Sequence, residues 1–313
     1  MKKAIAILCI ITALCLISCS GGNEITPSGA SESEESKVVR EGKREPIPEG
    51  AKVITNVDYK NSGKMGDNDG PAYCVYSEKG FNKASMDVSI SKINANTVRK
   101  DGRFVNAYMF LGCDVYDGAW WCNCFDAGFC YSGNKPQWHL FYNIYQPAVD
   151  RESTWFESGV NLDGTHDYRL ILDTSGEDEK AVIVVWDITE NKKADEKAFS
   201  VKDMKKDGSN TAYLMDFALD YPENLRKDAA GKDTDDWSEI TLYNTDENLY
   251  IQNINVSNVK IYASENEYVW DEKKTDCRSL WPDRTDRKID YACTKVIGDG
   301  YDHDFRVDLD MNR

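Results

Sequence analysis

Short segments in which apolar and polar residues alternate dominate the chain from about residue 51 onward. Ala84, Met86, Val88 and Ile90 alternate with serine and aspartate, which is the period-two pattern of a strand with one buried face. Similar alternating or continuous apolar segments predict further strands at 104–111, 137–145, 168–172, 181–186, 212–219, 240–243 and 249–262. Clusters of Gly, Asn, Asp and Lys between these segments are typical of turns.

Helical periodicity is almost absent, and only residues 221–231 are compatible with one short helix. Many short strands separated by turn signals favour an antiparallel sandwich over folds with helical layers. We therefore predict an all-β fold, with a single antiparallel sandwich in residues 51–266. Residues 267–313 are expected to form a C-terminal extension packed on the sandwich.

The first 18 residues have a different character. Lys2 and Lys3 precede an apolar run that is typical of a signal peptide and too short for a spanning helix, which needs about 20 apolar residues. The sequence Leu-Ile-Ser-Cys at 16–19 resembles the lipobox of bacterial lipoproteins. That resemblance implies removal of residues 1–18 and acylation of Cys19, with palmitate among the expected chains. It also implies a lipid-anchored protein at the cell membrane or outer membrane, outside the cytoplasm; the alternative is an ordinary secretory signal with a chance cysteine.

Residues 19–50 are predicted to be a disordered linker behind the lipidated cysteine. They are rich in Ser, Gly, Glu and Pro and contain no aromatic residue, so they cannot bury a hydrophobic core. A flexible segment of this length has an end-to-end distance of about 30 Å, enough to hold a domain clear of the lipid headgroups.

The charge of the chain restricts its partners. It has 54 acidic and 38 basic residues, for a formal net charge of −16. Such a surface repels phosphate backbones and anionic headgroups, so nucleic acid is an unsuitable ligand, whereas neutral sugars, cations or basic partners are compatible. No second apolar run approaches spanning length, so lipid alone is the expected attachment.

Three segments carry a resemblance to a known fold family: 166–173, 182–187 and 254–262. Their order and spacing look like the concanavalin A-like lectin/glucanase jelly roll, which laminin-G-like domains and family 16 glycoside hydrolases share. The resemblance covers roughly residues 75–265. It implies a jelly-roll sandwich whose expected ligand is a polysaccharide or glycan.

The most unusual segment is 112–130, which contains four cysteines, two adjacent tryptophans and three aspartates. We expect a functional loop between two strands. Trp120 and Trp121 cannot both face inward if extended, so one should meet solvent and offer its indole to a sugar ring. Trp138 and Tyr142 complete the predicted carbohydrate-binding set. The alternative is that disulfides staple the loop and both indoles cover the edge of the sandwich.

The same segment suggests a metal site and disulfides. Asp114, Asp117 and Asp126 offer the oxygen ligands that calcium prefers. Export makes disulfides the default, and we expect Cys277 to pair with Cys293. The other cysteines have no readable connectivity, and five leave one over: Cys74, Cys113, Cys122, Cys124 and Cys130. A zinc site is the alternative for the last four, although their spacing lacks the paired C-x₂-C form.

Motifs for catalysis are weak. The E-x-D-x-(x)-E strand of family 16 hydrolases has no match, and the acidic clusters lie in turn-like segments. Residues 137–139 resemble the Q-x-H strand of jelly-roll alginate lyases, but that family's other motifs are missing, so His139 is interpreted as an ordinary strand histidine. We assign no catalytic residue and favour non-catalytic carbohydrate binding. The alternatives are a divergent polysaccharide-degrading enzyme on the same fold, or an adhesion lipoprotein with a protein partner.

Overall fold

The computed structural model defines the positions of most residues that follow the predicted linker. It describes residues 44–54, 70–118, 120–132, 135–146, 151–220, 232, 248–281, 294–300 and 304–311. Contacts group residues 37–313 into one compact unit, apart from residues 1–36. Cys19, the helix expected at 221–231 and the strand expected at 240–243 lie outside the described residues. Within the described part, no helix is long and apolar enough to cross a membrane.

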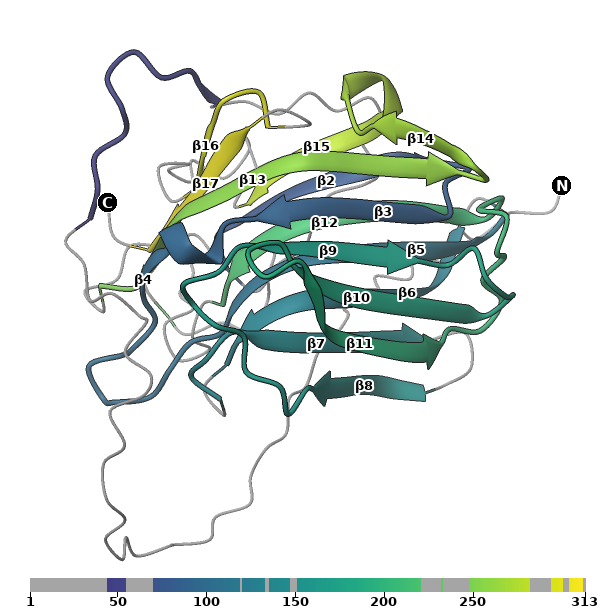
Figure 1. Cartoon of the computed structure of the whole chain (residues 1–313), viewed down its shortest axis with the longest axis horizontal. Helices are drawn as coiled ribbons and strands as arrows, with labels where there is room; N and C mark the ends of the chain where they lie inside the picture. The colour runs from purple at the N-terminus through teal and green to yellow at the C-terminus, as the bar shows by residue number, and fades with distance from the viewer. Residues whose placement is uncertain are drawn as a thin grey trace, which may run out of the picture. The chain divides into compact units, whose positions relative to one another are not determined.

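Two antiparallel sheets form the unit (Figure 1). The seven-stranded sheet has the order β15 (Thr275–Trp281), β2 (Ala72–Lys79), β12 (Thr211–Leu219), β5 (Ala107–Asp117), β6 (Trp120–Tyr131), β7 (His139–Gln146) and β8 (Arg151–Glu157). The ten-stranded sheet has the order β1 (Val53–Ile54), β16 (Thr294–Ile297), β17 (Phe305–Asp310), β13 (Tyr250–Ala263), β3 (Lys83–Val88), β9 (Tyr168–Asp173), β10 (Lys180–Asp187) and β11 (Lys192–Ser200). Its remaining strands, β4 (Asn94–Asn96) and β14 (Asn266–Val269), both pair with β13.

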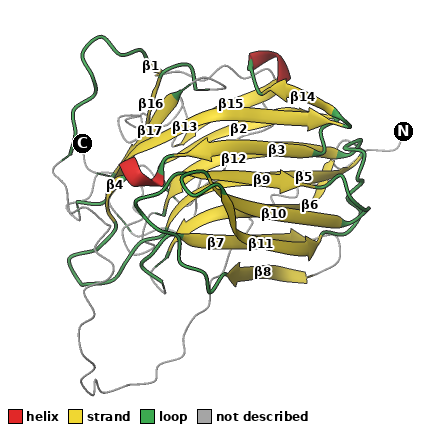
Figure 2. Cartoon of the chain, viewed as in Figure 1, coloured by secondary structure: helices red, strands yellow, loops and turns green. Residues whose placement is uncertain are grey.

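The prediction of an all-β antiparallel sandwich is confirmed, and the chain crosses between the sheets as in a jelly roll. β12 pairs with both β2 and β5, and β3 pairs with both β13 and β9, so sheet neighbours come from distant parts of the sequence. The described helical residues are confined to two 3-10 turns, η1 (Ile90–Lys92) and η4 (Glu272–Lys274), shown in red in Figure 2.

The C-terminal residues are more closely integrated than the sequence indicates. β15 is an edge strand of the seven-stranded sheet, whereas β16 and β17 belong to the ten-stranded sheet. A boundary at residue 266 therefore does not separate a sandwich from an extension, because strands on both sides of it pair with one another.

Alternation along the strands places the main hydrophobic core between the sheets. In β9 and β10 every second residue is buried, as the period-two pattern predicts. Side chains from both sheets meet there, among them Met86, Tyr168, Met109, Phe129 and Phe217. Complete burial of side chains of this size contributes about 1.5–3 kcal/mol each.

Residues 112–130 are not a loop, contrary to the sequence-based expectation. They form most of the β5–β6 hairpin, in which Cys113 pairs with Phe125 and Asp114 with Cys124. The reason is that Phe125, Ala127 and Phe129 alternate with polar or small residues and point into the core. Asp114, Asp126, Gly112 and Gly128 occupy the opposite face of the same strands, and Asp117 and Gly118 lie at the hairpin end.

Candidate functional site on the outer face of the seven-stranded sheet

The seven-stranded sheet has a second hydrophobic cluster on the side away from the core, which we call the outer face. It consists of Cys74, Phe110, Cys130, Phe141 and Leu214, with Tyr76 and Tyr108 packed against it. The solvent-facing side of an antiparallel sheet is usually polar, because only one face is needed to cover the core. An apolar cluster on this side is therefore a feature that the fold alone does not require.

An exposed tryptophan lies at one end of the outer face. Trp155, on edge strand β8, is 40% exposed. Its ring stacks on Phe141 with centroids 5.1 Å apart, and its edge contacts the ring of Tyr108 at 6.1 Å. A large indole supported by two aromatic rings offers a rigid apolar surface to a ligand.

Glu157 fixes the orientation of this indole. One carboxylate oxygen accepts a hydrogen bond from Trp155 Nε1 at 2.9 Å. The other accepts from the Ser132 hydroxyl at 3.0 Å and lies 3.2 Å from His139 Nε2. These contacts leave the Trp155 side chain little freedom before any ligand arrives.

His139 lies beside Glu157 in a fully buried position. Its Nδ1 donates to the carbonyl oxygen of Gln137 at 2.6 Å, since a carbonyl can only accept. Burial lowers the pKa of His139, against the opposing effects of Gln137 and Glu157. As expected from the alternation, His139 lies on the face opposite Trp138, next to the Glu157 carboxylate that holds Trp155.

A second exposed tryptophan lies near the tip of the β5–β6 hairpin, two strands from Trp155. Trp121 is 44% exposed, and its ring lies 6.0 Å from that of Tyr145. Its register partner is Tyr116 of β5, which follows the Asp114–Cys124 pair along the hairpin. The exposure of Trp121 agrees with the expectation that one of the two adjacent tryptophans meets solvent.

Three carboxyl groups lie on the central strands of the same face. Asp114, Asp126 and Asp216 come from β5, β6 and β12 and share the outer face. Burial, with smaller effects from the charges of Asp216 and Asp114, raises the pKa of Asp126 well above its usual value. A carboxyl group in this setting retains its proton nearer to neutral pH than an exposed aspartate does.

Gly112 provides the space for Asp126. The two residues are register partners, and a Cβ atom on Gly112 would lie 2.6 Å from Asp126 Oδ1. Burial also raises the pKa of the Cys74 thiol, followed by the effect of nearby Asp216. The middle of the outer face therefore favours neutral, protonated groups.

Two of the predicted carbohydrate-binding residues face the core. Trp138 is buried against Tyr131, and Tyr142 stacks between Phe156 and Phe199 with both centroid distances at 4.7 Å. The sequence correctly placed Trp138 and Tyr142 on one strand face, but that face covers the core. Trp120 lies in β6, and its side chain is outside the described residues.

The predicted calcium ligands are only partly brought together. Asp114 and Asp126 share the outer face with Asp216, whereas Asp117 is exposed at the end of β5 and pairs in register with Trp120. Among the described residues, no group of three or more His, Cys, Asp or Glu side chains is arranged to hold a metal ion. Cys113, Cys122, Cys124 and Cys130, the alternative zinc ligands, likewise form no such group among the described residues.

The disulfide bonds expected within residues 112–130 are not formed. Cys113, Cys122 and Cys130 are free thiols, as is Cys74. Cys113 points into the main core, whereas Cys130 belongs to the outer-face cluster, so the sheet separates their sulfur atoms. Cys124 occupies the outer-face alternation of β6, opposite Asp114. Cys277 is buried in β15, and its predicted partner Cys293 lies outside the described residues.

Sequence reasoning missed Trp155 and Glu157. The adjacent pair Trp155-Phe156 carries the same signal as Trp120-Trp121, because neighbours in a strand face opposite sides. Here Phe156 stacks on Tyr142 in the core and Trp155 faces outward. Recognition of residues 151–157 as a strand would have identified the position.

No protein-family description matches the sequence, and no match was found among curated proteins. Solved structures overlap weakly with the chain. SCP-B, a member of the Eqolisin family of peptidases in a complex with the tripeptide Ala-Ile-His, is 10% identical, covers 76% of this chain and 95% of its own, and has a TM-score of 0.38.

Two further overlaps involve other β-sandwiches. The LG1-3 region of the laminin alpha2 chain is 13% identical, covers 65% of this chain and 33% of its own, and has a TM-score of 0.31. Toad ovary galectin in complex with thio-digalactose is 10% identical, covers 49% of this chain and 95% of its own, and has a TM-score of 0.26. Overlaps this weak do not assign a function.

Proposed function

We propose that this protein is a lipid-anchored, extracytoplasmic, lectin-like sandwich that binds a neutral polysaccharide or glycan on the outer face of the seven-stranded sheet. The observation that carries the proposal is the exposed indole of Trp155, fixed by Glu157 and supported by Phe141 and Tyr108. A rigid indole can stack on the apolar face of a sugar ring without a large loss of side-chain entropy.

The composition of the outer face suits sugar hydroxyl groups. Trp121 offers a second exposed indole, and the carboxyl groups of Asp114, Asp126 and Asp216 lie on the same face, on the adjacent strands β5, β6 and β12. The net charge of −16 disfavours anionic glycans and favours neutral ones. The acylated Cys19 would hold the sandwich at a membrane surface while the linker keeps it accessible.

The test is a glycan array probed with the soluble chain that begins after Cys19. We expect binding to a defined set of neutral glycans, weakened about tenfold by Trp155→Ala, which corresponds to about 1.4 kcal/mol. Tyr268→Ala is the matched control, because Tyr268 is also exposed but belongs to β14 of the other sheet. No bound glycan, or equal binding by wild type and Trp155→Ala, would contradict the proposal.

A second candidate function is hydrolysis of the bound glycan. It is favoured by Asp126, whose raised pKa suits a general acid at the middle of the same face. Release of new reducing ends from a glycan found on the array would support it, provided that Asp126→Asn abolishes release and retains binding. If wild type releases no reducing ends from any glycan that it binds, the protein acts by binding alone.

A further inference from the structure

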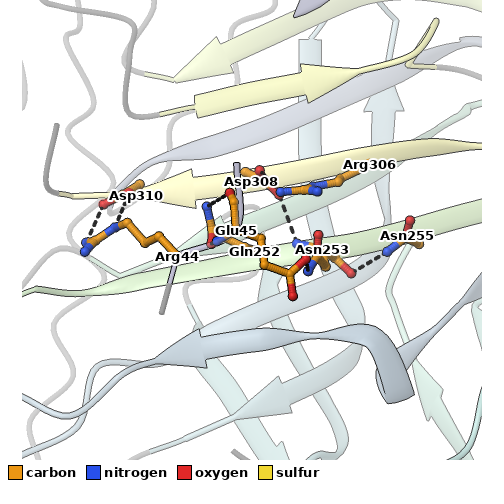
Figure 3. A network of polar contacts seen from close by, with 8 residues as sticks. All are labelled: Arg44, Glu45, Gln252, Asn253, Asn255, Arg306, Asp308 and Asp310. Carbon is orange, nitrogen blue, oxygen red and sulfur yellow. Dashed lines mark hydrogen bonds and ion pairs between the residues drawn. The ribbon is translucent and has the colours of Figure 1, made fainter. Parts of the chain in front are cut away.

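The last residues of the predicted linker are attached to the outer surface of the ten-stranded sheet, as Figure 3 shows. Arg44 forms a bidentate ion pair with Asp310 of β17, with distances of 2.6 and 2.9 Å. Its guanidinium group also donates to Asn248 Oδ1 and lies 4.5 Å from the ring centroid of Tyr250. Arg44 is therefore fixed by charge, hydrogen bonding and an aromatic face together.

Glu45 makes an independent set of contacts with β13. Its backbone N–H donates to Gln252 Oε1 at 3.0 Å, and its carboxylate accepts from Asn253 Nδ2 at 2.7 Å. Gln252 and Asn253 are both buried. β13 therefore binds both the main chain and the side chain of Glu45.

A β-bulge in β13 builds the receiving surface. The pairing with β17 shifts between Ile251 and Ile254, and Asn253 adopts a positive φ of 60°. Asparagine tolerates this left-handed conformation better than most residues. The backbone N–H of Asn253 donates to Asp308 Oδ1 at 2.9 Å, and Arg306 holds Asp308 through two hydrogen bonds of 2.7 and 2.6 Å (Figure 3).

The chain remains attached beyond Glu45. The backbone of β1 pairs with β16, and the Gly298 N–H donates to the Lys52 carbonyl. Without the contacts of Arg44 and Glu45, the chain would leave the sandwich at β1, the edge strand of the ten-stranded sheet. With them, it leaves at β13 and β17, on the face opposite the candidate site.

We propose that Arg44 and Glu45 form a clasp that fixes where the tether leaves the sandwich, so that an anchored molecule holds its glycan-binding face away from the membrane. This inference rests on the proposed lipid anchor and the proposed binding face. Acylation at Cys19 then places residues 20–43 between the lipid and the clasp, and the exit point at the clasp biases the sandwich to turn its ten-stranded sheet toward the membrane.

The test uses the full lipidated chain reconstituted in phosphatidylcholine vesicles with acceptor-labelled headgroups. A fluorescent amino acid replaces either Glu196, exposed on the outer surface of the ten-stranded sheet, or Trp121, exposed on the outer face of the seven-stranded sheet. We expect more efficient energy transfer to the membrane from position 196 than from position 121. Combined Arg44→Ala and Glu45→Ala substitutions should abolish that difference, whereas Arg103→Ala, which removes an exposed turn ion pair, should retain it.

The outcomes of this test separate failure of the clasp from failure of the anchor. Equal transfer from both positions in the anchored wild-type chain, or an unchanged difference in the double variant, would overturn the clasp. No transfer from either position would show that the chain is not held at the membrane. As a second readout, the Glu45 amide should exchange its hydrogen about tenfold faster in Arg44→Ala, and unchanged exchange would also count against the clasp.

Discussion

At the scale of single residues, Glu157 links the polar and the apolar parts of the candidate site. Its two carboxylate oxygens accept hydrogen bonds from Trp155 and Ser132, and one of them lies 3.2 Å from His139 Nε2. The contacts resemble the supporting shell of a preorganised binding site, in which one residue meets the ligand and its neighbours fix its position. In this account Trp155 contacts the glycan and Glu157 is a positioning residue.

We therefore predict that Glu157→Gln weakens glycan binding about three- to tenfold, because a hydrogen bond to a charged acceptor contributes more than one to a neutral amide. The side chain keeps its size, so the melting temperature should change little. Titration calorimetry with an array-selected glycan measures the affinity. Unchanged affinity would show that the orientation of the indole does not depend on the charge of Glu157.

His166 provides a test of the electrostatics away from the site. Its Nδ1 lies 2.8 Å from Asp187 Oδ2, and this hydrogen bond raises the pKa of His166. A raised folded-state pKa stabilises the protein fully below the unfolded pKa of about 6.5, and this stabilisation is lost as pH rises through the folded pKa.

His166→Asn should accordingly destabilise the protein more at about pH 6 than at about pH 8. Urea unfolding of both proteins at the two pH values measures the difference. A difference between variant and wild type that grows with pH would contradict the assigned direction.

At the scale of elements, the β5–β6 hairpin determines the candidate site. Phe125, Ala127 and Phe129 cover the core from one face of β6, and Asp126 and Gly128 lie on the other. Close approach across the hairpin requires glycine at position 112. An added Cβ there would lie 2.9 Å from both the Leu214 side chain and the Phe125 carbonyl oxygen, as well as against Asp126.

Gly112→Ala should therefore lower the free energy of unfolding by about 1–3 kcal/mol, as expected for an overpacked strand. Gly159→Ala is the matched control, because an added Cβ at that position meets nothing within 4 Å. Chemical denaturation of the two variants gives the comparison. Equal stability of both would show that the hairpin can relax around the added methyl group.

The sequence predicted the elements with strong alternation better than it predicted the site. The strand expected at 168–172 is β9 (Tyr168–Asp173), and the strand expected at 181–186 is β10 (Lys180–Asp187). The β5–β6 hairpin was misread because aspartate, glycine and cysteine are common in loops, although Phe125 and Phe129 already carried the strand pattern. Which face of a strand covers the core depends on sheet pairing, so the burial of Trp138 could not be predicted from local sequence.

At the scale of the whole molecule, the two outer faces of the sandwich have separate tasks in this account. The ten-stranded sheet receives the N-terminal segment through Arg44 and Glu45, and the seven-stranded sheet presents the aromatic and acidic groups. A protein held by its N-terminus gains from this division, because attachment and ligand binding do not compete for one surface.

Anchoring at Cys19 has its own test in the expressing bacterium. We expect wild type to sediment with membranes and to incorporate a palmitate analogue, and Cys19→Ala to lose both properties. Lasting attachment to a membrane needs several acyl chains, and the acylated Cys19 would carry them. Because Cys19→Ala loses all of these chains, we expect a large difference in sedimentation. Membrane association of Cys19→Ala equal to that of wild type would contradict a lipid anchor at this cysteine.

The central claim is that a glycan binds the outer face of the seven-stranded sheet. Hydroxyl-radical footprinting with and without an array-selected glycan tests it most directly, because Trp155, Trp121 and Tyr268 are all exposed and readily oxidised. We predict that the glycan protects Trp155 and Trp121 from oxidation and leaves Tyr268 on the other sheet unprotected. Protection of Tyr268, with Trp155 oxidised as fast as in the free protein, would contradict the account.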